Sequence, residues 1–266
     1  MQGIMTPRPV LPFVLACACL LAGCATGPHP RDPYEGFNRK VFAFNDSLDK
    51  AVLKPIAKGY EKVLPQFART GVTNFFDNLG MVVTTINDAI QLKGEKVPVD
   101  ILRFATNLTF GIFGLIDVAT ELRIENRDED FGQSLGYWGM NTGPYLVLPL
   151  LGPSNVRDGV GLAVDFVVSP YYYVEDEPVV RWGLLALNIV NARANLLPAE
   201  KLLDETGVER YTFLRDVYLQ RREYLIHDGN PPVANTGSRP KTLLELEQED
   251  MQGEPVAPVA PAKKKP

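Results

Sequence analysis

Apolar residues recur at helical spacing along most of the chain, and this pattern predicts a mostly α-helical protein. An N-terminal helix is indicated by one apolar stripe, made of Phe37, Val41, Phe44, Leu48 and Val52. We expect Asp32 to be the N-cap of this helix, with Pro33 at its first position and Glu35 completing a capping box. Pro55 should interrupt the helix.

A last helix is predicted near residue 210. Thr206 and Glu209 match another capping box. After them, one face carries Tyr211, Leu214, Tyr218 and Leu225. The charged residues are expected to lie off that face: Arg215, Asp216, Arg221, Arg222 and Glu223.

Two central stretches, residues 70–92 and 97–122, combine a broad apolar arc with very little charge. In the first stretch only Asp77 and Asp88 are charged, and residues 104–116 of the second carry no charge. The narrow polar strip of the first stretch is uncharged and holds Asn74, Asn78 and Thr85. Such helices are either buried in a large core or face lipid on one side and a wet space on the other. Both interpretations stay open at this point.

Residues 131–156 form a run of 26 residues without any charge. Its glycines and prolines break any long helix, so the segment cannot span a membrane and should be a folded-back loop. Aromatic rings occur on it and shortly after it, at Tyr137, Trp138, Tyr145 and Tyr171 to Tyr173. These rings suit a bilayer interface, although aromatic packing in a water-soluble core is the alternative.

The N-terminus has the features of a bacterial lipoprotein signal. Arg8 precedes an apolar run over residues 10–22, too short to span a bilayer, and Leu21-Ala22-Gly23-Cys24 resembles a lipobox. This resemblance implies cleavage before Cys24, a diacylglycerol on its sulfur and an acyl chain (palmitate) on the new amine. A soluble secreted protein with a chance cysteine is the alternative. The predicted organisation is a signal peptide at 1–23, a tether at 24–31, a helical domain at 32–232 and a disordered tail at 233–266.

Composition narrows the possible functions. The 266 residues are 45% hydrophobic and carry a net charge of −5, so the chain can form a core and is not expected to bind nucleic acid. Cys17 and Cys19 leave with the signal peptide, so no disulfide is possible in the mature chain. With two histidines and no phosphate-binding glycine pattern, we expect neither a metal centre nor a cofactor.

Ser134 lies in a Gly-x-Ser-x-Gly pattern, which suggests the nucleophile elbow of a phospholipase with His227 downstream. The elbow requires a buried strand before the serine, and the charged residues 125–130 cannot form one. We therefore predict that the protein is not an enzyme. The acidic groups at 128–130 and 175–177 are expected to be solvated loops.

Two further carboxylates, Asp117 and Asp165, lie in apolar surroundings. We expect each to be satisfied by a helix N-terminus or by an arginine such as Arg103 or Arg157. Contact with lipid head groups is the alternative.

A series of motifs then resembles the MlaA/VacJ family of outer-membrane phospholipid-transport lipoproteins. In family order over some 200 residues they are Asp32-Pro33, Glu35-Gly36-Phe37-Asn38-Arg39, Phe44-Asn45, Pro55, Pro65, Asn74-Phe75, Asn78-Leu79, Arg103-Phe104, Asn107, Phe131-Gly132, Leu135-Gly136, Gly143-Pro144-Tyr145, Leu148-Pro149 and Arg157-Asp158. One departure is Gly80-Met81-Val82, where many relatives have a proline, so we expect a straighter helix here. The tail is also peculiar to this chain.

The resemblance implies a ring-like disc of amphipathic helices with a central amphipathic channel, lipid-anchored in the inner leaflet of the outer membrane. In such proteins, phospholipid mislocalised to the outer leaflet passes through the channel to a soluble periplasmic carrier, which hands it to an inner-membrane ABC complex. This process maintains lipid asymmetry. Trimeric porins are the implied neighbours.

We hypothesise a passive conduit whose direction comes from its partners. The candidate channel residues are Asn74, Phe75, Asn78, Gly143, Pro144 and Tyr145, and the candidate gate is the stretch 132–152. The competing hypothesis is a structural lipoprotein that braces porins or envelope layers and moves no lipid.

Overall fold

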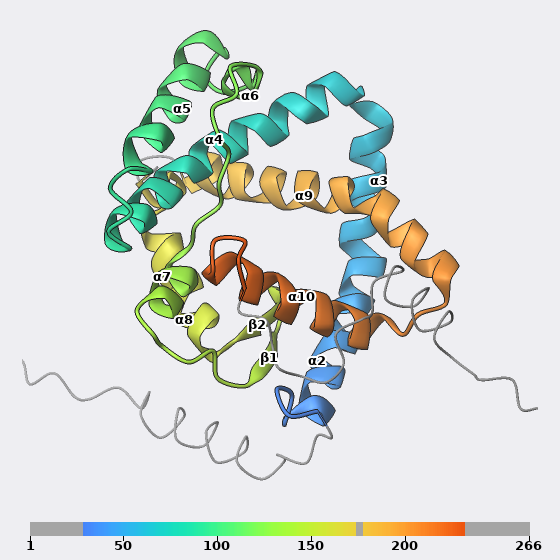
Figure 1. Ribbon diagram of the computed structural model, residues 1–266. Helices are drawn as coiled ribbons and strands as arrows, with labels where there is room; N and C mark the ends of the chain where they lie inside the picture. Colours follow the sequence, from blue (N-terminus) through green and yellow to red (C-terminus); the bar gives the residue numbers. More distant parts are fainter. Residues whose placement is uncertain (1–28, 174–177, 232–266) are drawn as a thin grey trace, which may run out of the picture. The chain divides into compact units, whose positions relative to one another are not determined.

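The computed structural model describes residues 29–173 and 178–231, and these residues are mostly helical (Figure 1). The signal peptide, Cys24, most of the tether and the tail lie outside the described residues. The longer elements are α2 (Glu35–Leu48), α3 (Lys54–Val63), α4 (Gln66–Ile90), α5 (Val97–Phe110), α8 (Val156–Val168), α9 (Pro178–Thr206) and α10 (Arg210–Ile226). The shorter ones are α6 (Val118–Glu121), α7 (Phe131–Tyr137), β1 (Tyr145–Leu148), β2 (Gly152–Asn155) and the 3₁₀ turn Pro170–Tyr173. Within the described ranges, no helix combines the length and apolarity needed to cross a bilayer.

The N-terminal helix does not stop at Pro55, contrary to the prediction. A π-helical stretch, Asp49–Leu53, joins α2 to α3, and Pro55 lies in the first turn of α3. The wider π turn accommodates a residue that has no N–H and whose ring collides with a preceding carbonyl. The capping box is also wrong, because Tyr34 precedes the helix and makes no side-chain cap. Asp32 is instead buried, where it accepts hydrogen bonds from Asn38 Nδ2 and the Tyr211 hydroxyl.

Helix α4 covers residues 70–90 of the predicted stretch 70–92 and runs without interruption through Gly80-Met81-Val82. It packs against α5 and α9, and α9 also packs against α3 (Figure 1). The predicted stretch 97–122 divides into α5 and α6, because the backbone turns sharply after Phe110. At this turn Ile112 and Phe113 both have positive φ.

The uncharged stretch 131–156 does fold back, but with more regular structure than the predicted loop. It forms α7 and then an antiparallel hairpin in which Tyr145 pairs with Asn155 and Leu148 with Gly152. Two asparagines of α2 hold this hairpin. Asn38 Nδ2 donates to the Tyr145 carbonyl, and Asn45 Nδ2 donates to the Leu148 carbonyl.

Helix α10 begins where predicted, but its cap and its buried face differ from the prediction. Thr206 ends α9, and Glu209 alone caps α10 by accepting from the backbone amides of Tyr211 and Thr212. Tyr211 and Leu219 join Tyr145 and Val147 in the hydrophobic core cluster. Two residues expected off the buried face, Arg215 and Arg222, are buried as well, because acidic partners on other elements receive them: Asp32, Glu35, Asp130 and Asp158.

Candidate lipid-contacting surface and polar interior

The distribution of polarity is the reverse of that in most water-soluble proteins. Over residues 29–173 and 178–231, twenty-two of the buried residues are polar or charged and nine are hydrophobic. Large apolar side chains, by contrast, are exposed on almost every helix. A soluble fold normally buries its large aliphatic residues and keeps charged ones outside. The medium around much of this surface is therefore expected to be apolar.

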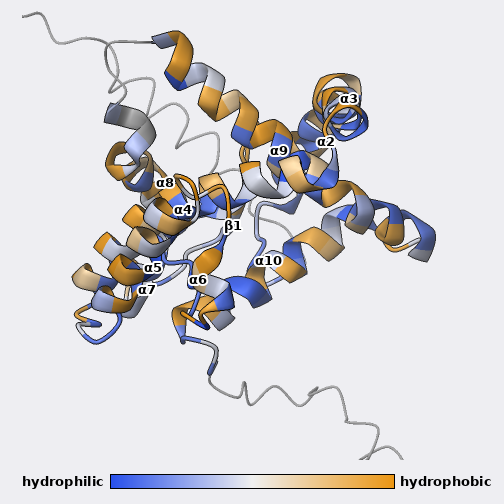
Figure 2. Cartoon of the chain, turned by 90° about the horizontal axis from the view of Figure 1, so that it is seen from above, coloured by the Kyte–Doolittle hydropathy of each residue, from blue (hydrophilic) through white to orange (hydrophobic). Residues whose placement is uncertain are grey.

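The turn between α5 and α6, residues 110–116, is the clearest apolar surface. Phe110 and Phe113 are each 72% exposed, and Ile112 and Ile116 are more than half exposed. The turn contains no charged residue. In Figure 2 the ribbon of α5 carries much orange, whereas α10 shows long blue stretches. An exposed apolar patch of this kind marks a membrane or protein contact.

A polar cluster after this turn joins α5 to the start of α6. Arg103 Nη2 lies 2.7 Å from Asp117 Oδ2, and Asn107 Nδ2 donates to Asp117 Oδ1. Burial alone would raise the pKa of Asp117, but hydrogen bonds from Thr120 and Asn107 and the charge of Arg103 hold the pKa below its usual value. The expectation that Asp117 is satisfied by a helix N-terminus or by an arginine is confirmed, since the Thr120 amide of α6 and Arg103 both reach it.

A second cluster contains Asp165 and Ser134. The Asp165 carboxylate accepts from the backbone amide of Phe131, the first residue of α7, and from Asn87 Nδ2. Burial nevertheless raises the pKa of Asp165 to about 6. Ser134 lies inside α7, where its hydroxyl donates to Asn87 Oδ1 and accepts from Gln91. No described strand precedes Ser134, so the nucleophile elbow is not formed.

The acidic group at 128–130 is only partly solvated, contrary to the prediction, and residues 175–177 lie outside the described residues. Glu129 is buried and receives Lys93 Nζ at 3.0 Å and Gln91 Nε2 at 2.9 Å. Asp130 caps α7 and pairs with Arg222. Only Asp128 is largely exposed.

Arg127 reaches inward from the same loop to two fully buried carboxylates. Its Nη2 atom lies 3.3 Å from Asp88 Oδ2, donates to Asp100 Oδ1 and donates to the Lys96 carbonyl. Burial and the neighbouring Asp100 raise the pKa of Asp88 to about 7, against the opposing effect of Arg127. The sequence pattern could have indicated this cluster of Arg127 with Asp88 and Asp100, because the two aspartates are isolated acidic residues in apolar stretches.

The three candidate channel residues of α4 lie beside the apolar turn. Asn74 Nδ2 donates to the Leu115 carbonyl, while Asn78 is buried and is covered by Gly114. Asn74 and Asn78 line a small polar cavity with Arg103 and Asp117, and Asn74 also lines an open apolar hollow of about 510 Å³. The Phe75 ring packs edge to face on Phe76.

The other three candidates lie at the start of the hairpin. Gly143 is exposed with a positive φ, and Pro144 is partly buried. Tyr145 is fully buried in the core cluster, with its ring against Tyr211 and Tyr218. The second set therefore runs from the surface at Gly143 into the core at Tyr145, whereas Asn74 of the first set borders an apolar hollow.

The family model of the MlaA lipoprotein matches residues 30–225. The protein named "Intermembrane phospholipid transport system lipoprotein MlaA" from Haemophilus influenzae is 33% identical, over 91% of this chain and 99% of that relative. Its namesake from Escherichia coli is 32% identical, over 79% and 86%. An uncharacterised Rickettsia felis protein is 35% identical, over 72% and 76%.

A solved structure described as "Structural basis for maintenance of bacterial outer membrane lipid asymmetry" is similar with a TM-score of 0.61 and 31% identity. The match covers 73% of this chain and 98% of that one. The mostly helical fold, the polar interior and these matches define the class: a lipoprotein family with a shared helical domain. The chain belongs to the MlaA lipoprotein family.

Proposed function

We propose that this protein is a lipoprotein of the outer membrane that removes phospholipid from the outer leaflet and passes it to a periplasmic carrier. The names of the Haemophilus and Escherichia relatives support phospholipid transport as the general function. In the proposal, lipidated Cys24 holds the chain on the periplasmic side, in the inner leaflet, and trimeric porins are its neighbours. Transport of this kind keeps the outer leaflet poor in phospholipid.

The observation that carries the proposal is the reversed polarity around α4. A phospholipid needs apolar contacts for its acyl chains and polar partners for its head group along a single path. The hollow beside α4 offers apolar contacts for the acyl chains through Phe67, Leu115 and Ile116. Asn74 borders both this hollow and the polar side chains of Asn78, Arg103 and Asp117, so polar partners for the head group lie next to the apolar contacts.

We propose Asn74, Phe75 and Asn78 as residues of the lipid path. Gly143, Pro144 and Tyr145 are the second set of residues that we propose for the lipid path. Tyr145 is buried in the core cluster, so its proposed role is to support the path and not to contact lipid. The gate is assigned to residues 132–152, which are exposed between α7 and β1 and again at the hairpin tip 149–151. Asn38 and Asn45 hold β1 by hydrogen bonds, and Asn45 also accepts from the Leu150 amide at the tip, so motion is expected between α7 and β1.

The test is to measure surface-exposed phospholipid on intact cells that lack the chromosomal copy and any redundant one. Complementation should restore wild-type levels with the intact chain and fail with Cys24→Ala or with Asn74→Leu/Asn78→Leu. The matched control is Asn195→Leu, which changes an exposed asparagine on α9. Protein level and helicity are checked for each variant.

A disulfide engineered across residues 132–152 should block transport, and reduction should restore it. If surface phospholipid stays at wild-type level in the deletion strain, the transport proposal fails. The structural role beside porins then replaces it, and loss of envelope integrity without lipid accumulation would be its signature.

A further inference from the structure

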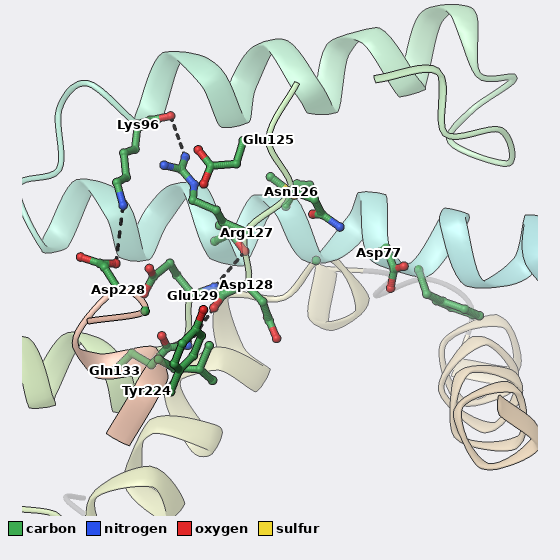
Figure 3. Close-up of a pocket in the computed structure, with 16 residues that line it drawn as sticks. Asp77, Lys96, Glu125, Asn126, Arg127, Asp128, Glu129, Gln133, Tyr224 and Asp228 are labelled. Atoms are coloured by element: carbon green, nitrogen blue, oxygen red, sulfur yellow. Dashed lines mark hydrogen bonds and ion pairs between the residues drawn. The ribbon is translucent and has the colours of Figure 1, made fainter. Parts of the chain in front are cut away.

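A cavity of about 540 Å³ lies beside the lipid path proposed above and shares Asp77 with the polar cavity of that path (Figure 3). Its walls come from the middle of α4, the loop 125–129 and the C-terminal end of α10. Five acidic residues and two basic residues line it: Asp77, Glu125, Asp128, Glu129, Asp228, Lys96 and Arg127.

Both basic residues and two of the acidic residues are already paired. Arg127 is directed at Asp88 and Asp100 behind the cavity wall. Lys93, which lies outside the lining, is 3.0 Å from Glu129 and 2.6 Å from Asp228. Lys96 Nζ is 3.5 Å from Asp228. These pairs leave no excess positive charge inside the cavity.

The remaining carboxylates have little compensation. In the described part of the chain, Asp77 and Glu125 form no ion pair, and Asp128 meets only the exposed Arg221 at 3.5 Å. Partial desolvation at the cavity wall and the charge of Asp128 together raise the pKa of Asp77. The cavity therefore attracts a cation, since like carboxylates around one space repel each other.

Gln133 adds an independent sign of a missing ligand. Its side chain is only 1% exposed and is among those that line the cavity (Figure 3). The amide nitrogen Nε2 donates to the Asp128 carbonyl and to Asp130. The amide oxygen Oε1 accepts no hydrogen bond from the described residues. A buried carbonyl without a donor is costly, so this atom is expected to meet an N–H of a bound group.

The chemistry of the walls favours an organic ammonium group over a metal ion. Within residues 29–173 and 178–231 no group of three carboxylate, histidine or cysteine side chains converges as a metal site requires. The lining instead includes the aromatic rings of Phe76 and Tyr224. Aromatic faces attract ammonium groups, and a cavity of this size holds a lipid head group.

We propose that this cavity binds the ammonium group of an aminophospholipid head, with Asp77 and Asp128 as counter-ions and the Gln133 carbonyl as acceptor. The inference rests on the proposed transport function and adds a head-group preference to it. Ethanolamine-type lipids fit because their amine carries N–H donors and a positive charge. Anionic glycerol-type heads bring no cation and are repelled by the carboxylates.

The test is calorimetric titration of the purified full-length lipoprotein in detergent. The probes are dihexanoyl-phosphatidylethanolamine, dihexanoyl-phosphatidylglycerol and free ethanolamine. We expect the ethanolamine lipid to bind about tenfold more tightly than the glycerol lipid, through two exposed ion pairs and aromatic contact. The preference should shrink in high salt.

The variant Asp77→Asn/Asp128→Asn should lose this preference. Its matched control is Glu95→Gln/Glu205→Gln, which removes two exposed carboxylates outside the cavity and should keep the preference. Both replaced pairs are on the surface, so unchanged helicity is expected, and circular dichroism checks it.

Equal binding of both lipids by the intact chain overturns the inference, as does a preference that survives in the Asp77→Asn/Asp128→Asn variant. Free ethanolamine binding as tightly as the lipid would assign the cavity to a small amine and overturn the lipid assignment. The surface-phospholipid assay separates the two proposals. A chain that clears phospholipid without a head-group preference keeps the transport function and loses only this cavity's role.

Discussion

Two neighbouring connections in this protein have opposite polarity and opposite placement. Residues 110–116, between α5 and α6, are apolar and exposed. Residues 125–130, between α6 and α7, are charged, yet Glu129 is buried and Arg127 is directed into the interior. In water both placements would be unfavourable, because the first exposes apolar surface and the second desolvates charge.

The comparison teaches that each connection is matched to a different environment. The charged connection is stable inside because every buried charge meets a partner on α4, α5, α10 or the connection between α4 and α5. The apolar connection is stable outside if lipid, not water, surrounds it. A helical domain organised in this way can contact a bilayer laterally while it keeps a polar space within.

The largest effect is expected from removing the cation of the charged connection. Arg127→Ala leaves Asp88 and Asp100 buried without a counter-charge, and we expect a loss of about 3–5 kcal/mol in the free energy of unfolding. Chemical denaturation in detergent measures this loss, and adding Asp88→Asn should recover part of it. Arg221→Ala is the control, since its ion pair is exposed and should contribute less than about 1 kcal/mol. Equal losses for both arginines would contradict the role assigned to Arg127.

A somewhat smaller effect is expected from placing a charge on the apolar connection. Phe113→Asp should weaken liposome binding of the unlipidated Cys24→Ala protein by about 2–3 kcal/mol, because a carboxylate is expensive in hydrocarbon. Flotation with liposomes measures the bound fraction. Phe113→Leu should bind normally, and Gln220→Asp adds the same charge on the exposed side of α10. Unchanged flotation of Phe113→Asp would show that the turn does not enter lipid.

The shape of the apolar connection is tested at Gly114, which has a φ of +88° and lies against Asn78. A Cβ at this position would be 2.9 Å from Asn78 Cβ, so Gly114→Ala should cost about 1–2 kcal/mol. Thermal unfolding gives the difference. Gly80→Ala is the control, because nothing lies within 4 Å of its added Cβ and helical propensity favours alanine. If the two variants unfold at the same temperature, the contact with Asn78 is unimportant.

A further effect concerns pH. Burial raises the pKa of Asp88 to about 7 in the folded chain, above the usual value of 3.8. The unfolded chain therefore loses this proton first, so the contribution of Asp88 to stability falls as pH rises from about 4 to 7. Asp88→Asn removes this dependence, and its stability relative to the unchanged protein should increase by about 1.4 kcal/mol for each pH unit between these two pKa values. A difference that is constant from pH 4 to 8 would contradict the assignment.

Local patterns predicted the helices well and their ends poorly. The apolar stripe and uncharged strip indicated α4, and the spacing after residue 210 indicated α10. Asp32 and Thr206 have the residue types of N-caps, but Asp32 binds Tyr211, 179 positions away, and Thr206 belongs to the preceding helix. A cap depends on which competing donor is nearest, and that donor can come from a distant element.

The cavity between α4, the loop 125–129 and α10 was also predictable only in part from the sequence. Asp77 and the acidic run near residue 128 were visible as charges, but nothing local indicated that α10 would bring Tyr224 and Asp228 opposite them. The burial of Gln133 and of Arg222 was equally hidden, because burial of a polar side chain depends on partners far away in the chain.

The sequence by itself determined the class of this protein: a helical domain with apolar arcs, an uncharged polar strip and a family motif series, all of which depend on residue spacing. Only the tertiary structure decided which polar residues are inside, which apolar residues remain outside and where α4, the loop 125–129 and α10 enclose a cavity. The physical reason is that helical periodicity is a property of neighbouring residues. The pairing of buried charges such as Arg127 with Asp88 and Asp100 is a property of helices brought together from distant parts of the chain.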